Sequence, residues 1–507
     1  MASSADDPRL VAVDAGTSGL RAVVIDRSGT VVAEREVPYE PTHLPGRGVE
    51  QDAETWIAAM ETALAGVAPA AGTPAALAVT SQRATIVPVD ATGRALHPAI
   101  SWRDRRSEPQ CARLASRMTA AELQARTGLR LDSYFSLPKI LWLRDERPAA
   151  FAAARQFLTV HDLLVHHLTG RFATDWTQAS RTLAFDVRRL QWDEDILSAA
   201  GLSPDVLPEA LPPGTVAGSL RAEVARRVGL STSPPVVLAG GDQQAAALGL
   251  GVVAPGQAEV TTGSGAFVLA PVGEPRCDAD SRLLCSPAAV RGSWLLEGSV
   301  LTAMTSYRWL RREVAGLTGP TDVEAVLDAS PPGARGVLAL PRLAGAAAPR
   351  WDPSARGVLF NLGLEHTADD LGRAVLEGIV HDAAGCLAEV ERVLGGPLSE
   401  VRVSGSAAAS DHFNQLQADA FGRPVLPTAS RHATALGAAI LAAVAVGVHD
   451  DLTAAVAAMT RTDTRRGRVP DPARSELYER LRALRESADA ALAASGAYRE
   501  AASIADR

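Results

Sequence analysis

At 507 residues, the chain is too long for one ordinary hydrophobic core, so we expect two or three domains. Its residues are 47% hydrophobic and 21% charged, which is typical of a globular protein and excludes a largely disordered one. The formal net charge of -8 argues against a nucleic-acid-binding protein, because a phosphate backbone requires a basic surface.

The N-terminal sequence MASSADDPRL lacks the basic start and the apolar stretch of a secretory signal. No apolar run reaches the length of a membrane-spanning helix, so we expect a cytoplasmic protein with no membrane partner. The four cysteines lack the close spacing of a zinc site or a redox pair. We therefore expect buried free thiols at Cys111, Cys277, Cys285 and Cys386.

The chain opens with two strand patterns, LVAVDAG and RAVVID, which predict a hairpin. The turn between them contains Gly16, Thr17, Ser18 and Gly19, and a tight turn with free backbone N–H groups can bind an anion. Asp14, beside this turn, could hold a magnesium ion through water. An ordinary hairpin turn with a carboxylate at its start explains the same stretch.

From residue 53 onward, helix patterns alternate with strand patterns, which indicates an α/β sheet with helices on its faces. Arg83 follows one predicted strand and Trp102 ends another. Arginine offers a fork of donors to hydroxyl oxygens, and an aromatic face stacks on the C–H surface of a sugar or polyol. Both residues are therefore candidates for a sugar site.

The stretch AGGDQQAAALG, residues 239–249, places Asp242 between an apolar strand and an Ala/Leu helix. Because two glycines precede it, the carboxylate can be exposed at the strand end and reach a substrate hydroxyl. Alternatively, Asp242 serves as the N-cap of the following helix. Both roles are compatible, since a cap also holds the carboxylate in place.

A second block begins near residue 255 with GQAEVTTGSGAF, another strand pair around a Gly-rich turn that contains Thr262, Gly263 and Ser264. Its similarity to the first hairpin hints at duplicated domains. Two such turns facing each other across a cleft could hold a polyphosphate. Helix patterns follow at 298–315, 366–394, 411–421 and 433–447.

A third turn follows the strand pattern VRVS, where Gly405, Ser406 and the helix start at Asp411 would let a base or ribose approach closely. A plain strand-to-helix turn that needs small residues for packing explains it equally well. From about residue 464, a basic linker leads to a charged amphipathic helix, which we expect to dock on the second domain with a frayed end.

These motifs carry a resemblance to a known family. The run Tyr134, Ser136, Lys139, Ile140, Trp142, Leu143, Asp145 and Glu146 resembles the first signature of the FGGY family of carbohydrate kinases. Residues 357–377 resemble the second signature, with Asn361 where the family has glycine. The resemblance extends from about residue 10 to 450, through DAGTSGLR, GGDQQAAALG, TTGSGAF, WDPSARG and ATALGAAILA.

The resemblance implies an α/β protein of two actin-like, ribonuclease-H-like domains, at 1–250 and 251–465, with a helical tail at 466–507. It implies that ATP, Mg²⁺ and a small sugar or polyol meet in the interdomain cleft, with Asp242 as general base and Asp14 at the metal. The implied substrate contacts are Arg83, Trp102, Tyr134, Asp242, Gln243 and Phe267. The implied ATP contacts are Gly16, Thr17, Ser18, Arg21, Thr262, Gly263, Ser264, Gly405, Ser406 and Asp411.

Glycerol kinases have the closest local resemblance, but they follow the arginine with a glutamate where this chain has Ala84. The loss of an acceptor for a buried hydroxyl costs about 1–3 kcal/mol, so we expect a sugar or polyol other than glycerol. Ser406 replaces a family glycine as well. Two alternatives stay open, a glycerol kinase proper and a non-catalytic sugar or nucleotide sensor. Dimers occur in the family, so a homodimer is also open.

Overall fold

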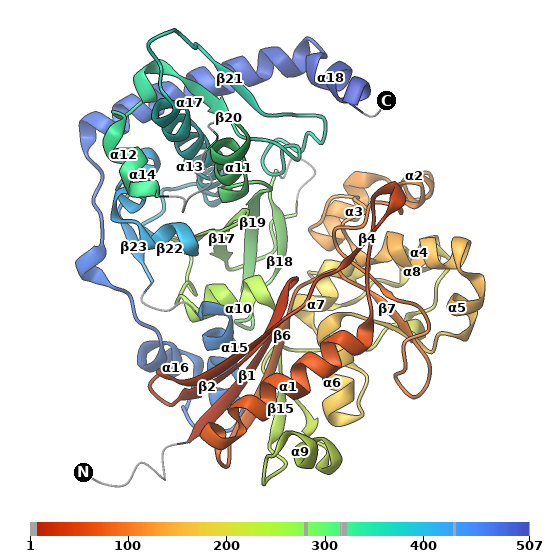
Figure 1. The fold of residues 1–507 in the computed structure, drawn as a ribbon. Helices are drawn as coiled ribbons and strands as arrows, with labels where there is room; N and C mark the ends of the chain where they lie inside the picture. The colour runs from red at the N-terminus through yellow and green to blue at the C-terminus, as the bar shows by residue number, and fades with distance from the viewer. Residues whose placement is uncertain (1–7, 278–281, 315, 317–321, 429–431, 506–507) are drawn as a thin grey trace, which may run out of the picture.

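The computed structural model describes residues 8–277, 282–314, 316, 322–428 and 432–505. Figure 1 shows two lobes built on sheets, with a third, mostly helical lobe beside the first of them. Within the described residues, no helix combines the length and the apolar character that crossing a membrane requires. Three of the cysteines are buried free thiols as predicted, and the fourth, Cys111, is partly exposed.

The first sheet has six strands in the order β14-β15-β6-β1-β2-β3. The strands β1, β2 and β3 are antiparallel, whereas β6 and β15 run parallel to β1. The predicted first hairpin is therefore confirmed as β1 and β2. The bounds are β1 Arg9–Ala15, β2 Gly19–Asp26, β3 Val31–Pro38, β6 Ala76–Ser81, β14 Val216–Ser219 and β15 Pro235–Gly241.

The second sheet has the order β18-β19-β17-β16-β22-β23. Its strands β16, β17 and β19 are antiparallel and β22 and β23 run parallel to β16, which repeats the pattern of the first sheet. The predicted duplication of the sheet is confirmed by this repeated order. The bounds are β16 Gln257–Thr262, β17 Ala266–Val272, β18 Leu284–Pro287, β19 Trp294–Val300, β22 Glu400–Ser404 and β23 Val425–Pro427.

Helices cover both faces of the first sheet. One face packs against α1 (Ala53–Ala71), α6 (Val160–Thr169) and α9 (Ala222–Val228). The other packs against α15 (Ala433–Ala445) and α16 (Leu452–Met459). These last two helices fall within the predicted second domain by sequence, but they complete the core of the first sheet.

The helix α10 (Asp242–Gly249), which begins with the candidate base, packs closely on α15. A Cβ added at Gly249 would lie 1.9 Å from the carbonyl oxygen of Ala433, and one at Gly437 would lie 1.8 Å from that of Ala245. Only glycine permits such an approach of two helix backbones. The contact fixes α10, and with it the position of Asp242.

The second sheet packs against α13 (Ala368–Leu394), and α13 is surrounded by further helices. The tail helix α17 docks on this lobe as predicted, against α13, α14 and β20. The remaining elements of the lobe are α11 Met304–Trp309, α12 Val323–Ala329, β20 Leu338–Leu340, β21 Val358–Phe360, α14 Asp411–Phe421, α17 Pro472–Ala494 and α18 Ala497–Ala505. The last two residues of the chain, which we expected to fray, lie outside the described residues.

The helix predicted at 298–315 begins later than expected. Residues 298–300 belong to β19 because they pair with β17, and α11 starts only at Met304 before continuing as a π-turn to Val314. Pairing between strands distant in sequence outweighs a local helical pattern here. Residue 315 lies outside the described residues. The helix predicted at 411–421 is confirmed with its bounds, and that at 366–394 begins two residues later.

The third lobe is inserted between β6 and β14 and has its own apolar core. From the sequence pattern, we did not predict this lobe as separate from the helices and strands of the first sheet. Its elements, with the small sheet that borders it, are β4 Thr42–Leu44, β5 Gly48–Gln51, β7 Val87–Val89, β8 Ala99–Ile100, α2 Glu108–Ala115, α3 Ala120–Thr127, α4 Ser136–Glu146, α5 Pro148–Ala153, β9 Gln156–Leu158, β10 Ala173–Asp175, α7 Trp176–Ala179, β11 Phe185–Asp186, β12 Gln191–Trp192, α8 Glu194–Ala200 and β13 Glu209–Leu211.

Candidate active site

Asp242 is the first residue of α10 and directly follows β15. Gly241 is the N-cap, so the alternative of Asp242 as the cap is wrong. The carboxylate accepts a hydrogen bond of 2.8 Å from the backbone N–H of Gln243, and its side chain is 26% exposed. A carboxylate that is fixed yet accessible suits proton transfer.

The two glycines before Asp242 have packing roles. Gly240 has φ +63°, and a Cβ there would lie 2.0 Å from the hydroxyl of Thr177. A Cβ on Gly241 would lie 2.7 Å from Cδ of Arg83. The glycines therefore make room for side chains beside the strand end, in addition to exposing the carboxylate.

Arg83 links Asp242 to a buried carboxylate that sequence reasoning missed. Its Nε lies 3.2 Å from the Asp242 carboxylate, and its Nη1 donates to Glu297 at 2.6 Å. Glu297 also accepts from Arg181 at 3.2 Å. Glu297 is 3% exposed in the apolar strand LLEGSV, and a lone acid in such a strand was the available signal.

Burial sets the charges of this cluster. It raises the pKa of Asp242 above the usual range of an aspartate, and the Arg83 guanidinium only partly opposes the shift. Burial alone would also raise the pKa of Glu297, but Arg181 and Arg83 hold it below the usual range of a glutamate. Burial thus favours the protonated form of Asp242, whereas the two arginines favour the charged form of Glu297, and a shifted carboxylate in a cleft is a candidate general base.

The aromatic candidates for the sugar site lie next to the first turn. The indole N–H of Trp102 donates to the Thr17 hydroxyl at 3.1 Å. The Trp102 and Tyr134 rings lie 5.3 Å apart between centroids, and the guanidinium of Arg181 lies 6.0 Å from the Tyr134 ring. The structure therefore brings together Thr17, Trp102 and Tyr134 near the arginine cluster.

Two further candidates for the sugar site, Phe267 and Gln243, come from β17 and α10. Phe267 is the second residue of β17 and lies opposite Ser299. Cross-strand pairing therefore puts it on the same sheet face as Glu297, two positions before Ser299 in β19. Gln243 has a buried amide oxygen with no hydrogen-bond partner among the described residues. An unpaired acceptor of this kind can receive a substrate hydroxyl.

The first turn closes by a bond of 2.9 Å from the N–H of Gly16 to the carbonyl of Gly19. Tyr39 and Gln82 donate to the carbonyl of Gly16, which leaves the turn firmly held. Ser18 is exposed at its tip. Arg21, which we predicted to contact ATP, forms an ion pair with Glu36 at 2.9 Å, so its guanidinium group is already engaged.

Asp14 lies at the end of β1 beside this turn and is half-buried. Burial raises the pKa of its carboxyl to about 7, and Asp242 adds to the shift while Arg21 opposes it. Within the described residues, no three His, Cys, Asp or Glu side chains form a metal cage. One or two carboxylates with water and phosphate oxygens are the set that Mg²⁺ prefers, so Asp14 and its neighbour Asp242 fit that ion.

Replacing Asp14 with Asn should stabilise the ligand-free protein at alkaline pH. In an unfolded chain this aspartate ionises near its ordinary value of 3.8, whereas in the fold it ionises near 7. The wild type therefore loses stability as pH rises from 4 to 7 and then levels off. We expect Asp14→Asn to raise Tm by a few degrees at pH 8 and less at pH 5, measured by thermal unfolding. An equal shift at both pH values would contradict the assignment.

The second turn and the third turn are in direct contact. Gly263 closes the second turn by an N–H bond to the carbonyl of Gly265 at 2.8 Å. Gly405 has φ +88°, and a Cβ there would lie 2.4 Å from the carbonyl oxygen of Thr262. Ser406 follows it, exposed, at the start of a short 3-10 turn. The glycine is thus required at 405, while a serine is accommodated at 406.

Two arginines of the tail and one of α11 also lie at these turns. Asp411, predicted to contact ATP, is paired with Arg466 at 2.7 Å and with Arg468 at 2.8 Å. The side chain of Arg308 donates to the hydroxyl of Ser264 at 3.2 Å, which places a cation at the second turn. Arg308 was not predicted, because a single arginine in a helix pattern carries no signal of its own.

Two residues of the signatures have roles in holding the backbone. The ammonium group of Lys139 is buried and donates to the carbonyls of Ser133 and Phe135 at 2.7 and 2.9 Å, which fixes the backbone around Tyr134. Asn361 has φ +64°, a conformation that glycine and asparagine tolerate best, and its amide donates to the carbonyl of Gly336 at 2.9 Å. This accounts for asparagine at a position where the family has glycine.

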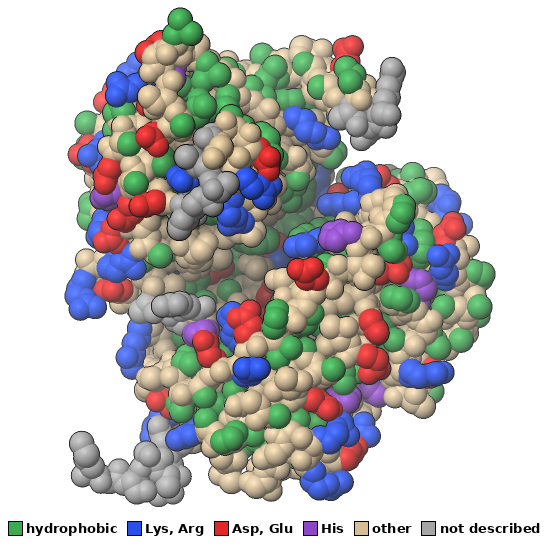
Figure 2. Space-filling model, in the orientation of Figure 1, with side chains coloured by type: hydrophobic (Ala, Val, Ile, Leu, Met, Phe, Trp, Pro, Cys, Tyr) green, Lys and Arg blue, Asp and Glu red, His purple; other side chains and the backbone are tan. Residues whose placement is uncertain are grey.

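Figure 2 shows the surface hollowed between the lobe of the second sheet and the helical lobe beside the first. The chain also has two main mixed sheets, each with a Gly-rich turn, and this defines the actin-like class of two-domain folds. Residues 9–249 match the N-terminal domain and residues 258–446 the C-terminal domain of the FGGY family of carbohydrate kinases. The chain therefore belongs to the FGGY family of carbohydrate kinases, whose members use ATP.

The proteins that this chain resembles in sequence or fold are named as kinases of different substrates. A glycerol kinase of Aromatoleum aromaticum is 40% identical over 454 residues, which cover 87% of this chain and 90% of that protein. The xylulose kinase of Rhodospirillum rubrum superposes with a TM-score of 0.86 at 27% identity, covering 96% of this chain and 99% of that one. The gluconate kinase of Lactobacillus acidophilus superposes with a TM-score of 0.90 at 24% identity, covering 97% and 99%.

Proposed function

We propose that the protein transfers the γ-phosphoryl group of ATP to a hydroxyl of a small sugar or polyol, with Asp242 as general base. The observation that carries the proposal is the accessible carboxylate at the end of β15, fixed by the Gln243 N–H and paired with Arg83. Phosphoryl transfer needs positioning, charge neutralisation and a group that accepts the proton of the attacking hydroxyl. Asp242 supplies the last of these.

In the proposed complex, the substrate lies between the arginine cluster and the aromatic side chains. Arg83 donates to substrate hydroxyl oxygens and Gln243 accepts from a hydroxyl through its unpaired amide oxygen. Trp102, Tyr134 and Phe267 contact the C–H surface of the substrate. Closure of the cleft would exclude water and so limit hydrolysis of ATP.

The phosphates of ATP would bind between the two Gly-rich turns. Gly16, Thr17 and Ser18 offer N–H and hydroxyl donors from one side, and Thr262, Gly263 and Ser264 offer them from the other. Asp14 would hold Mg²⁺, which neutralises phosphate charge when bound. The nucleoside would lie at the turn of Gly405 and Ser406, next to Asp411. Arg308 is a cation at the second turn and Arg21 is one beside the first turn, where each could face the phosphates.

The acceptor is proposed to be a sugar or polyol other than glycerol. Ala84 supplies no carboxylate beside Arg83, and the nearest buried carboxylate, Glu297, is already engaged by two arginines. Relatives named as glycerol, xylulose and gluconate kinases show that this fold serves several acceptors. Glycerol itself is the second candidate, favoured by the 40% identity to a glycerol kinase.

Release of ADP, followed with a panel of polyols, ketoses, aldoses and aldonates, tests the proposal. We expect turnover to depend on one member and to exceed that with glycerol. A protein that binds a panel member but shows no substrate-dependent ADP release would instead be a non-catalytic sensor. Gel filtration of the same sample would determine whether the protein is a homodimer.

Replacing Ala84 with Glu should increase kcat/KM for glycerol about tenfold relative to the preferred substrate. A glutamate would restore an acceptor worth about 1–3 kcal/mol for a buried hydroxyl. Ala84 is buried with φ +65°, so this position already holds a residue with a Cβ in the left-handed region and the exchange adds no further strain of that kind. The control is Ala84→Met, which adds similar length without an acceptor and should give no gain for glycerol. The pocket assignment fails if Ala84→Glu leaves the preference unchanged.

A further inference from the structure

A cavity of about 400 Å³ lies in the second lobe, between α13, α17 and the loop that follows β20. Its size falls in the range of small-molecule sites. His381, Gly385 and Ala388 lie along the face of α13 that lines it, and two small residues among them leave the space open. A Cβ built at Gly385 would meet no atom within 4 Å. None of the residues that we assign to the active site lines this cavity.

The lining carries an excess of positive charge. Six arginines line the cavity against four carboxylates, which leaves two positive charges in excess. Two of the carboxylates, Asp382 and Asp489, are shared among three arginines, since Asp382 pairs with Arg342 and Arg485 while Asp489 pairs with Arg342 and Arg350. The six arginines are Arg282, Arg342, Arg350, Arg392, Arg482 and Arg485.

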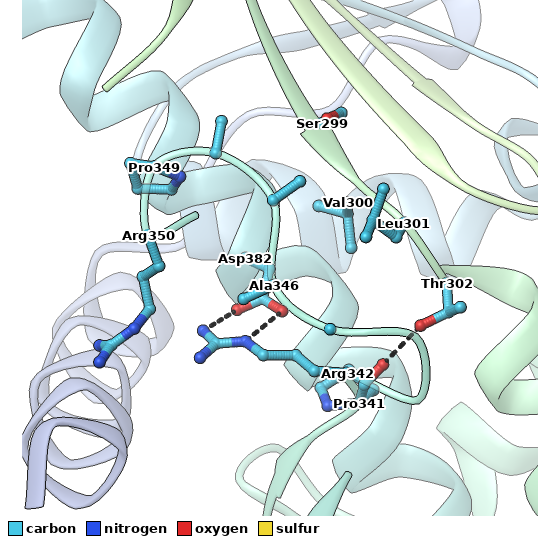
Figure 3. A pocket seen from close by; sticks show the side chains of 13 residues that line it. Ser299, Val300, Leu301, Thr302, Pro341, Arg342, Ala346, Pro349, Arg350 and Asp382 are labelled. Carbon is cyan, nitrogen blue, oxygen red and sulfur yellow. Dashed lines mark hydrogen bonds and ion pairs between the residues drawn. The ribbon is translucent and has the colours of Figure 1, made fainter. Parts of the chain in front are cut away.

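Figure 3 shows part of this arrangement from a smaller adjoining pocket. Arg342 is paired with Asp382 of α13, and Arg350 extends away from the loop toward a neighbouring helix. Arg350 pairs there with Asp489 of α17 at 2.7 Å and is 28% exposed. The guanidinium group of Arg350 is therefore accessible for further hydrogen bonds.

His381 lines the cavity, but both of its ring nitrogens are buried away from the open space. The residue is 3% exposed, and neither ring nitrogen has a hydrogen-bond partner among the described residues. Burial holds the pKa of His381 well below its usual range, and the nearby Arg485 adds to this effect, so the ring is neutral. A neutral His381 adds no charge to the lining, so the excess of positive charge comes from the arginines.

We infer that this cavity binds a small phosphate monoester that also carries hydroxyl groups. A phosphate monoester has a charge of about -1.5 to -2 at pH 7, which matches the excess of two positive charges. Arginine forks pair with phosphate oxygens in a bidentate manner. A ligand larger than a bare inorganic anion, with hydroxyl groups for the other polar side chains of the lining, suits a cavity of about 400 Å³.

Isothermal titration with glucose 6-phosphate tests the inference, with the variant Gly385→Met as the main comparison. The methionine side chain would occupy part of the cavity without changing any charge, and methionine favours the helix over glycine. We expect at least tenfold weaker binding to Gly385→Met than to the wild type. The matched control is Gly396→Met, since a Cβ at Gly396 also meets no atom within 4 Å but the residue does not line the cavity.

A second variant, Arg350→Gln, removes one guanidinium without filling the space and should weaken binding about tenfold. Inorganic phosphate should bind the wild type more weakly than glucose 6-phosphate does. The affinity for uncharged glucose should be the same in Gly385→Met as in the wild type. The inference is overturned if Gly385→Met binds glucose 6-phosphate as tightly as the wild type does. It is also overturned if the substitution weakens the binding of the dicarboxylate malonate but not that of glucose 6-phosphate. Binding requires no turnover, so a failure of the proposed phosphoryl transfer leaves this test intact.

Discussion

Replacing Asp242 with Asn should lower kcat by about 10²–10⁴-fold, the usual contribution of a positioned general base. Asparagine keeps an oxygen that can accept from Nε of Arg83, now 3.2 Å from the carboxylate, so Arg83 should stay in place. The KM for ATP should change little, because the ATP turns lie on other elements. Steady-state kinetics at saturating ATP, with the preferred substrate of the panel, measures both constants.

The pH profile separates loss of a base from a general disturbance of the site. Because burial raises the pKa of Asp242 above its usual range, wild-type kcat/KM should fall as pH drops below that raised pKa. This acidic limb should vanish in Asp242→Asn. The control Gln244→Met removes an acceptor 3.4 Å from Nη1 of Arg83 and should keep the limb, with kcat within about tenfold of wild type. Full turnover by Asp242→Asn would exclude the proposed base.

Motifs close together in sequence were predictable because each carries its own local signal. The two Gly-rich hairpins and the glycine pair before Asp242 are visible as breaks in apolar strand patterns. Their repetition indicated the duplicated sheet, and the structure repeats five strands of the first sheet in the second, in the same order and directions. The family resemblance then supplied what these signals shared, namely a cleft between two domains.

Contacts between segments that are distant along the chain could not be predicted from local sequence patterns. Glu297 lies 214 residues from Arg83 along the chain, and no local pattern indicates that the two side chains pair. The late start of α11 has the same cause, because strand pairing of residues 298–300 with β17 decides it. The closure of the first sheet's core by α15 likewise depends on a contact between Gly249 and Gly437 that only the fold creates.

Replacing Glu297 with Gln should destabilise the protein strongly, although the residue touches no predicted ligand. Glu297 is the shared partner of Arg83 and Arg181, which are 4% and 1% exposed. Removing one member of a buried ion pair leaves an uncompensated charge and costs on the order of 3–5 kcal/mol. We expect a lower midpoint of urea unfolding and a raised KM for the sugar, because Arg83 loses its anchor.

A double-mutant cycle shows whether charge compensation is the cause. Arg181→Met removes one of the two arginines that Glu297 neutralises, so Glu297→Gln combined with Arg181→Met should be less destabilised than the sum of the single variants. The matched control, Glu209→Gln, breaks an ion pair with Arg171 whose side chains are 58% and 41% exposed, and should cost less than about 1 kcal/mol. Additive effects in the cycle would mean that Glu297 acts by packing, and the anchoring of Arg83 would then need another explanation. Coupling in the cycle would instead identify Glu297 as the residue through which the second sheet positions Arg83, the arginine that we propose to bind the substrate.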